Sequence, residues 1–258
     1  MQTVTRRRLL MNSSAILTVG NSTTTRGKPQ AKAQIKGVAF DAFTIFDPRS
    51  IAMEAEQMIP GRGTELTTAW RTRQFEYCWL RTLNRNYVDF WQVTSEALAF
   101  ACESTRIRLA PEARMRLMNA HLRLQPWADS VDALIQMRRA GLRLAYVSNF
   151  THRMMATISD AAGVSRLFER QLSTDAVRAF KPDPRAYAMA EDAFQLPREN
   201  ILFAAFGGWD AAGAKSYGLE TFWVNRTDAP LEELGVTPDA TGRSLAELAQ
   251  FALLRSGD

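Results

Sequence analysis

Asp41 is the residue best placed for chemistry, because it directly follows a short apolar run, residues 35–40. Such a run predicts a buried strand, and an aspartate at a strand end is usually a turn or capping residue. A carboxylate in this place becomes a nucleophile when nearby cations and hydrogen-bond donors orient it. The chain offers such groups in three later segments, Ser148-Asn149, Lys181 and Asp210.

Lys181 can supply the cation. Prolines follow it at positions 182 and 184, and rigid prolines favour a fixed orientation of the lysine. The alternative is an ordinary exposed loop lysine. Asp210 can hold Lys181, and it can also cap a helix that begins at Ala211. These two roles of the aspartate are compatible.

Ser148 and Asn149 can donate hydrogen bonds to a substrate oxygen or to a leaving group. Their alternative role is to cap a helix ahead of Thr151. Both residues follow a second apolar run, residues 142–147, which predicts another strand.

The elements that must position these residues follow an alternating pattern over most of the chain. Strands are expected at 35–41, 142–147, 171–173, 201–206 and 221–224, and helices at 131–140, 154–162, 184–194 and 211–217. Strand–helix alternation predicts an α/β fold with a doubly wound, Rossmann-like parallel sheet. Ligands bind at the carboxyl ends of such strands, which is where the polar residues named above fall.

Residues 48–126 carry only helical periodicity, which predicts a helical cap inserted after the first strand. The core would then comprise residues 34–47 and 127–258. A cap in this place can close over the crevice at the strand ends.

The composition is that of a soluble globular chain, with 258 residues, 46% hydrophobic and 23% charged. Of its 32 basic residues, six lie in the first 33 positions, which hold no acidic residue; the other 26 face 27 acidic residues. The expected folded part is thus almost neutral, which argues against a nucleic-acid partner. Two histidines, and two cysteines without CxxC spacing, predict no metal site, and we expect no cofactor.

The first 33 residues have the order of an export signal. Arg6-Arg7 precede the apolar residues 15–19, and Ala31-Lys32-Ala33 has the pattern of a cleavage site. This order resembles a twin-arginine signal and predicts a periplasmic protein. The alternatives are a disordered basic tail or a misplaced start codon, with a cytoplasmic protein. No run approaches 18 apolar residues, so we expect no membrane span in the mature chain.

Four segments in order resemble the motifs of the haloacid dehalogenase superfamily. They are Phe40–Asp47, Ser148-Asn149, Lys181-Pro182-Asp183 and Trp209-Asp210. Within the predicted cap, residues 60–63, 70–81 and 89–90 resemble the type II L-2-haloacid dehalogenases. The likeness covers about residues 35 to 250. By analogy with these relatives, a homodimer is one expected assembly.

The resemblance implies roles for individual residues. Asp41 would be the nucleophile, and Lys181 would neutralise negative charge beside it. Asp210 would position Lys181 or the hydrolytic water. Thr44 and Ser148 would bind the substrate carboxylate or orient Asp41.

The resemblance also implies how the substrate is enclosed. Arg71, from the cap, would meet the substrate and assist halide departure, and Asn149 would help to hold the halide. Tyr187 would lie beside Lys181. Phe43, Phe75, Phe90 and Trp209 would form an apolar pocket wall, although core packing is the commoner fate of aromatic residues at helical spacing.

The implied reaction is hydrolytic removal of halide from a short L-2-haloalkanoic acid. Asp41 would displace the halide from C2 with inversion, and water would then cleave the aspartyl ester to give a 2-hydroxy acid. No metal takes part. Related phosphatases carry a second acid two residues after the nucleophile; here that residue is Phe43, which cannot donate a proton, so the pattern argues against phosphoryl transfer.

Departures from the family pattern keep a second function open. The segment from Asp41 to Asp47 is one residue shorter than usual and lacks a glycine. Phe206 and Gly207 stand where relatives carry a serine and an asparagine, and Thr72 replaces a longer amide. The alternatives are a weakly active or non-catalytic protein that binds small acids, or a hydrolase of another small substrate. Residues 208–216 have the wrong spacing for a nucleotide loop, and no G-x-S-x-G elbow is present.

Overall fold

A computed structural model describes residues 33–257. The predicted export leader, residues 1–33, lies outside this range except for its last residue. Across the described range, no helix is both long enough and apolar enough to cross a membrane.

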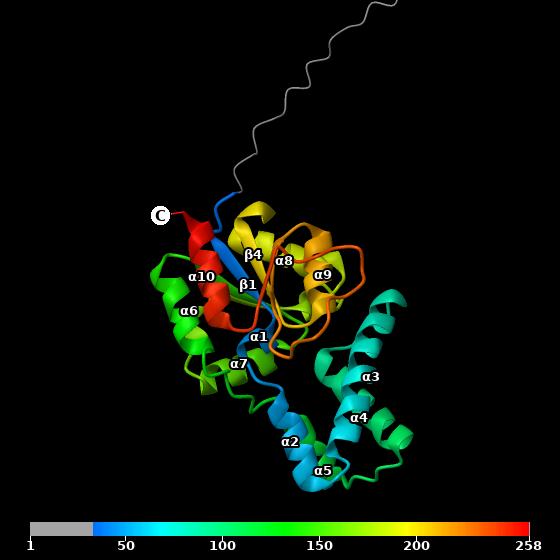
Figure 1. Cartoon of the computed structure of the whole chain (residues 1–258). Coiled ribbons are helices and arrows are strands. Elements are labelled where there is room, and N and C mark those ends of the chain that lie inside the picture. The colour runs from blue at the N-terminus through cyan, green and yellow to red at the C-terminus, as the bar shows by residue number, and fades with distance from the viewer. Residues whose placement is uncertain (1–32, 258) are drawn as a thin grey trace, which may run out of the picture. The chain divides into compact units, whose positions relative to one another are not determined.

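Six parallel strands form a single sheet in the order β3-β2-β1-β4-β5-β6 (Figure 1). Their bounds are β1 Gly37–Phe40, β2 Arg143–Ser148, β3 Arg170–Ser173, β4 Ile201–Ala205, β5 Glu220–Val224 and β6 Ala240–Gly242. From β1 the chain adds β2 and β3 on one side of the sheet. It then crosses back to add β4, β5 and β6 on the other side of β1. The predicted doubly wound parallel sheet is therefore confirmed.

The sheet is buried on both faces, as its apolar strands predict. Along β1, Val38 and Phe40 join one hydrophobic core, whereas Ala39 joins the other. The first face carries α6 (Ser130–Arg139), α7 (His152–Ala161) and α10 (Leu245–Ser256), and the second carries α8 (Pro184–Phe194) and α9 (Gly208–Tyr217).

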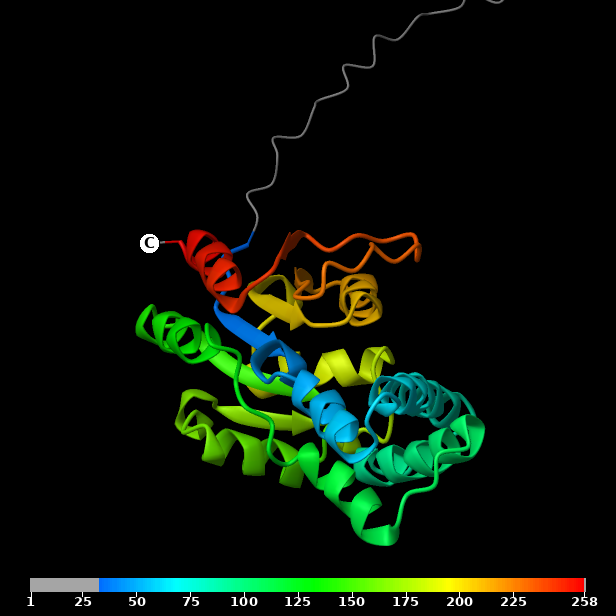
Figure 2. The same cartoon turned by 60° about the horizontal axis from the view of Figure 1, so that its bottom comes forward.

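Helices fill the segment between β1 and α6. They are α1 Ala42–Ile45, α2 Arg49–Met58, α3 Gly63–Leu83, α4 Phe90–Thr105 and α5 Pro111–Ala120. Figures 1 and 2 show α2–α5 packed together as a group. Buried Leu66 and Trp70 of α3 and Ala97 of α4 lie in the core that holds this group together.

The two ends of this helical segment lie next to each other. The backbone N–H of Asp47 donates to the carbonyl of Gln125 at 2.9 Å, and Phe46 pairs with Pro126 in an antiparallel bridge. The segment therefore leaves and re-enters the strand-and-helix part of the chain at one place.

Three elements had no counterpart among the expected ones, namely α1, β6 and α10. In α10, Ser244 caps the helix by accepting from the N–H of Glu247 at 3.1 Å. Oε1 of Glu247 in turn accepts a hydrogen bond from the backbone N–H of Arg243 at 3.2 Å. This reciprocal capping, with Leu245 and Leu248 buried against the sheet, explains why the helix forms.

Candidate active site

Asp41 lies at the carboxyl end of β1 and caps the single turn of α1. Its Oδ2 accepts from the backbone N–H of Phe43 at 3.1 Å. Only 8% of the residue is exposed. The strand and the cap thus fix the direction of the carboxylate before any substrate binds.

Lys181 lies between two carboxylates. Its Nζ is 2.7 Å from Oδ1 of Asp41 and 2.7 Å from Oδ2 of Asp210. Burial lowers the pKa of Lys181, but the charges of Asp210 and Asp41 together raise it by more, so the net shift is upward. The lysine therefore carries a positive charge at neutral pH although it is buried.

Asp210, in the first turn of α9, holds Lys181 and is held in turn by Tyr187. The hydroxyl of Tyr187 donates to Oδ1 of Asp210 at 2.7 Å. Burial raises the pKa of Asp210 to about 6; Asp41 adds to this effect, whereas Lys181 and Tyr187 oppose it. Burial also raises the pKa of Tyr187 well above its usual range, so its hydroxyl remains a donor.

Asn149 fixes the loop that carries Lys181. Its Oδ1 accepts from the backbone N–H of Lys181 at 3.0 Å and from the hydroxyl of Thr174 at 3.5 Å. Asn149 also lines the cavity beside Asp41, so one side chain both orients the lysine and faces the place where a ligand would bind.

Ser148 and Thr44 are placed differently. Ser148 lines the cavity, and its Oγ accepts from the N–H of Phe150 at 3.2 Å, which leaves its own hydroxyl proton for a ligand. The hydroxyl of Thr44 donates to the backbone carbonyl of Asp41 at 2.6 Å and is fully buried. This geometry suits orientation of Asp41 rather than direct contact with a ligand.

The cavity in front of Asp41 has a volume of about 20 Å³, which is room for roughly one water molecule. Its lining comes from strand ends and from the helical segment. It comprises Asp41, Phe43, Arg71, Phe75, Phe90, Ser148, Asn149, Phe150, Phe206, Gly207, Trp209 and Asp210. All four aromatic residues expected in a pocket wall lie here, whereas Lys181, Thr44 and Tyr187 lie behind this surface.

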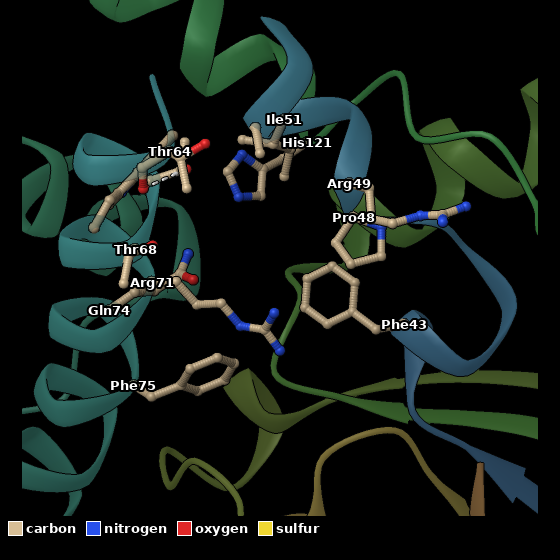
Figure 3. A pocket seen from close by; sticks show the side chains of 13 residues that line it. Phe43, Pro48, Arg49, Ile51, Thr64, Thr68, Arg71, Gln74, Phe75 and His121 are labelled. Carbon is tan, nitrogen blue, oxygen red and sulfur yellow. Dashed lines mark hydrogen bonds between the residues drawn. The ribbon is translucent and has the colours of Figure 1, made fainter. Parts of the chain in front are cut away.

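Arg71 is the cation that α3 contributes. Its guanidinium extends from α3 towards the ring of Phe43 (Figure 3), 5.8 Å from the ring centre of Phe206 and 6.0 Å from that of Phe75. Within residues 33–257 it makes no hydrogen bond or ion pair. Burial by the surrounding residues lowers the pKa of Arg71, and the charge of Asp41 raises it. An unpaired cation facing a carboxylate is suited to bind an anion.

Comparison with known proteins shows the family of the chain. The family model of the haloacid dehalogenase-like hydrolases matches residues 20–218. The chain belongs to this family. An (S)-2-haloacid dehalogenase from Pseudomonas sp. strain YL is 41% identical to it over 218 residues, which cover 84% of this chain and 94% of that protein.

A solved structure and a further curated protein are also similar to the chain. An L-2-haloacid dehalogenase from Xanthobacter autotrophicus, crystallised with chloropropionic acid covalently bound, matches with a TM-score of 0.78 and 33% identity, over 87% of this chain and all of that one. A haloacetate dehalogenase from Moraxella sp. strain B is 38% identical over 81% of this chain and 93% of its own length.

Three residues of this haloacid dehalogenase-like hydrolase hold the backbone next to the nucleophile and were not singled out in the sequence. The indole N–H of Trp127 donates to the carbonyl of Phe43 at 3.0 Å. Ser130 donates to the carbonyl of Ile45 at 3.0 Å. The third residue, Arg226, donates from Nη2 to the carbonyl of Thr44 at 3.1 Å. They bind backbone atoms, so nothing in the family motifs points to them.

The hydrolase presents Phe206 and Gly207 at the carboxyl end of β4, where the cavity lining includes both. A Cβ added to Gly207 would lie 2.8 Å from Nε1 of Trp209. The ring of Trp209 therefore occupies the space that a side chain at position 207 would need. The other carboxylate in the lining is Asp210, and within the described residues no group of three or more His, Cys, Asp or Glu residues is suited to hold a metal ion.

Proposed function

We propose that this hydrolase removes halide from (S)-2-haloalkanoic acids by way of an aspartyl ester on Asp41. One observation carries the proposal: Asp41 is held by Lys181 at 2.7 Å and by the N–H of Phe43 at 3.1 Å, in a small cavity that Arg71 also lines, with a guanidinium that has no hydrogen bond or ion pair to any residue of 33–257. The printed names of the relatives, (S)-2-haloacid dehalogenase and haloacetate dehalogenase, support the substrate class.

In the first step, a carboxylate oxygen of Asp41 attacks C2 of the substrate. A C–O bond forms, the C–halogen bond breaks with inversion, and the electron pair leaves with the halide. Arg71 and the amide of Asn149 stabilise the departing anion, while the hydroxyl of Ser148 binds the substrate carboxylate. A closed, water-poor cavity strengthens these interactions.

In the second step, water attacks the carbonyl carbon of the ester on Asp41. The 2-hydroxy acid leaves, the carboxylate of Asp41 is restored, and one proton is released. Asp210 is the carboxylate in the cavity that can accept this proton, because it is raised in pKa and held beside Asp41 by the shared Lys181. Lys181 stabilises the negative charge that develops on the carbonyl oxygen.

A second function, binding of a small acid with slow or no turnover, is favoured by one observation. Phe206 lines the cavity with an apolar ring at a place where type II relatives carry a hydrogen-bonding side chain. Loss of that group bears on the water-dependent second step rather than on ester formation.

The test is halide release from (S)- and (R)-2-chloropropionate by the wild type and by Asp41→Asn. We expect release from the S enantiomer, formation of the R-hydroxy acid, and no turnover by the variant. One turnover in ¹⁸O-water should leave the label in a peptide that contains Asp41. Label in the product alone would contradict the covalent route. Hydrolysis of p-nitrophenyl phosphate with magnesium, without halide release, would overturn the proposal.

A peptide that carries the acyl mass but never releases it would identify the binding function. The same preparation then also shows at which step the reaction stops, because ester formation and ester hydrolysis are followed separately.

We propose that residues 1–33 direct export through a twin-arginine route, based on Arg6-Arg7 and the apolar residues that follow. Cell fractionation of the full chain and of an Arg6→Lys, Arg7→Lys double variant tests this. Retention of both in the cytoplasm would contradict it. We also propose a homodimer by analogy with the family, and sedimentation of the purified chain tests that assembly.

A further inference from the structure

A second cavity of about 260 Å³ lies against the helical segment, between α2, α3 and the end of α5 (Figure 3). We call it the side chamber. It is lined by Phe43, Pro48, Arg49, Ile51, Ala52, Thr64, Thr67, Thr68, Trp70, Arg71, Gln74, Phe75 and His121.

The side chamber adjoins the catalytic cavity. Phe43, Arg71 and Phe75 line both, and Figure 3 shows these three side chains gathered at one end of the chamber. The catalytic cavity has about 20 Å³ and the chamber about 260 Å³. The chamber is therefore a larger free volume that shares part of its wall with the catalytic cavity.

Most of the surface exposed inside the chamber is apolar, although three threonines, Gln74 and Arg71 also line it, and no acidic residue does. Pro48, Ile51 and Ala52 supply aliphatic surface from the start of α2, and the ring of Trp70 packs edge-on against that of His121 at 5.2 Å. A chamber with such walls suits an uncharged hydrocarbon group.

Two of the basic residues in the lining, His121 and Arg49, place no charge inside the chamber. His121 is 3% exposed and its Nδ1 lies 3.3 Å from the carbonyl of Met118. Burial lowers the pKa of His121 to about 4, so the imidazole is neutral at pH 7. The side chain of Arg49 points away from the chamber (Figure 3), where it pairs with Asp47 at 2.7 Å and stacks on Trp127.

Arg71 stands between the two cavities. Because its guanidinium has no hydrogen bond or ion pair to break within residues 33–257, it can turn towards an incoming anion at little cost. Since Phe43, Arg71 and Phe75 form the wall that the two cavities share, a turn of Arg71 would open this wall. A substrate could then place its reacting carbon at Asp41 and its hydrocarbon chain in the chamber.

We propose that the side chamber is an alkyl-binding subsite that receives the C2 substituent of 2-haloalkanoic acids. The inference rests on the proposed function and specifies its substrates: acids with a chain of several carbons are preferred to haloacetate. Each methylene buried in the chamber should raise kcat/KM roughly fourfold. The chain lies away from the reacting atoms, so the gain should appear in KM rather than in kcat.

The test is the chain-length series (S)-2-bromopropanoate, -butanoate, -pentanoate and -hexanoate. For the wild type we expect kcat/KM to rise by about 60-fold from the first to the last acid. Ala52→Phe, which fills the chamber from α2, should remove this rise. Met53→Phe adds an aromatic ring on the exposed face of the same helix, where Met53 is 58% exposed, and should keep the wild-type rise.

Thr68→Phe is a second filling variant. Thr68 is exposed at the mouth of the chamber, so the substitution does not burden the core if Ala52→Phe fails to fold. It should also flatten the chain-length series. Equal rises in Thr68→Phe, Met53→Phe and the wild type would overturn the subsite.

Different results would refute the alkyl subsite and the dehalogenase function. Turnover of bromopropanoate by the wild type, with kcat/KM constant or falling along the series, refutes the alkyl subsite and leaves the dehalogenase in place. Absence of Asp41-dependent halide release from every acid of the series refutes the proposed function itself.

Discussion

Arg226 donates from Nη2 to the backbone carbonyl of Thr44 at 3.1 Å, across 182 positions of the sequence. The same guanidinium pairs with Asp129 at 3.0 Å and lies 4.6 Å from the ring centre of Trp127. The short turn after the nucleophile is therefore held from the loop that follows β5 and from the segment that leads into α6, as well as by its own cap.

Replacing Arg226 with methionine should loosen this turn. We expect a loss of about 2 kcal/mol in the free energy of unfolding, because a largely buried charged pair loses one partner, and a tenfold or greater fall in kcat. Urea denaturation and halide release measure the two effects. Arg255→Met is the matched control, since Arg255 pairs with Glu220 at 2.8 Å far from the turn. It should lose stability but keep kcat; an equal fall in kcat would contradict the role of Arg226.

Replacing Lys181 with methionine should abolish turnover. Asp41 and Asp210 would then be buried without their shared cation, and one of them would take up a proton. We expect kcat to fall by about 10³-fold and stability by about 3 kcal/mol. Adding Asp210→Asn to this variant should restore stability but not activity. Recovery of turnover in the double variant would show that Lys181 serves only to balance the charge of Asp210.

Turnover should depend on pH through Asp210. The pKa of this carboxyl is raised to about 6, mainly by burial, so protonation below pH 6 removes the group that accepts the proton from water. We expect kcat to decline below an apparent pKa near 6 that belongs to the coupled carboxylates and Lys181. A profile that stays flat from pH 5 to 8 would argue against this role.

The same shift has a consequence for folding stability. The folded pKa of Asp210 lies above its unfolded value, so the folded state binds more protons between about pH 4 and 6. The contribution of this group is therefore fully present below pH 4 and is lost as pH rises through 6. Asp210→Asn should flatten that part of the curve of unfolding free energy against pH, measured with urea.

Gly213 should be intolerant of even one methyl group. A Cβ there would lie 2.5 Å from the hydroxyl of Tyr187 and 2.6 Å from Cβ of Pro182. We expect Gly213→Ala to push Tyr187 away from Asp210, with a fall of about tenfold in kcat and a lower Tm. The double variant Gly213→Ala, Tyr187→Phe removes the clashing oxygen. It should recover Tm more than kcat, and failure of Tm to recover would place the strain elsewhere.

Restoring the family asparagine at position 207 should slow ester formation rather than raise activity. A side chain at Gly207 would meet Nε1 of Trp209 at 2.8 Å, so Gly207→Asn must displace a ring that packs on Phe75 at 5.2 Å. We expect slower ester formation, measured as a smaller initial burst of halide. Gly207→Asn combined with Trp209→Phe relieves the crowding and should recover part of the burst.

The sequence predicted the sheet because apolar runs of four to six residues mark β1, β2, β4 and β5. It did not predict β6, a three-residue edge strand of small residues, Ala240–Gly242, whose pairing depends on β5 alone. The helix α10 was missed although its capping box at Ser244 and Glu247 was visible. Bounds at the start of α9 also differ, since Gly208 rather than Ala211 begins the helix.

The site was predicted unevenly for a physical reason. Asp41, Lys181 and Asp210 carry charges at strand ends, and such ends meet at one edge of a parallel sheet. Trp127 and Arg226 act on backbone carbonyls, a role that any donor of suitable reach can fill, so their residue types gave no signal. The side chamber is a volume between helices, and its size depends on how these helices pack, which no local sequence pattern reveals.

The helices α2–α5 form a segment that can be exchanged as a unit. Its two ends are joined by the antiparallel pairing of Phe46 with Pro126 and by the hydrogen bond from the N–H of Asp47 to the carbonyl of Gln125. Because the two ends of this helical segment lie next to each other, another helical segment could replace it without shifting β1 or β2. Asp41 and Lys181 would keep their contact, whereas Arg71 and the aromatic walls supplied by α3 and α4 would be replaced. Residues that enclose the substrate can thus change while the nucleophile and its lysine stay where the sheet places them.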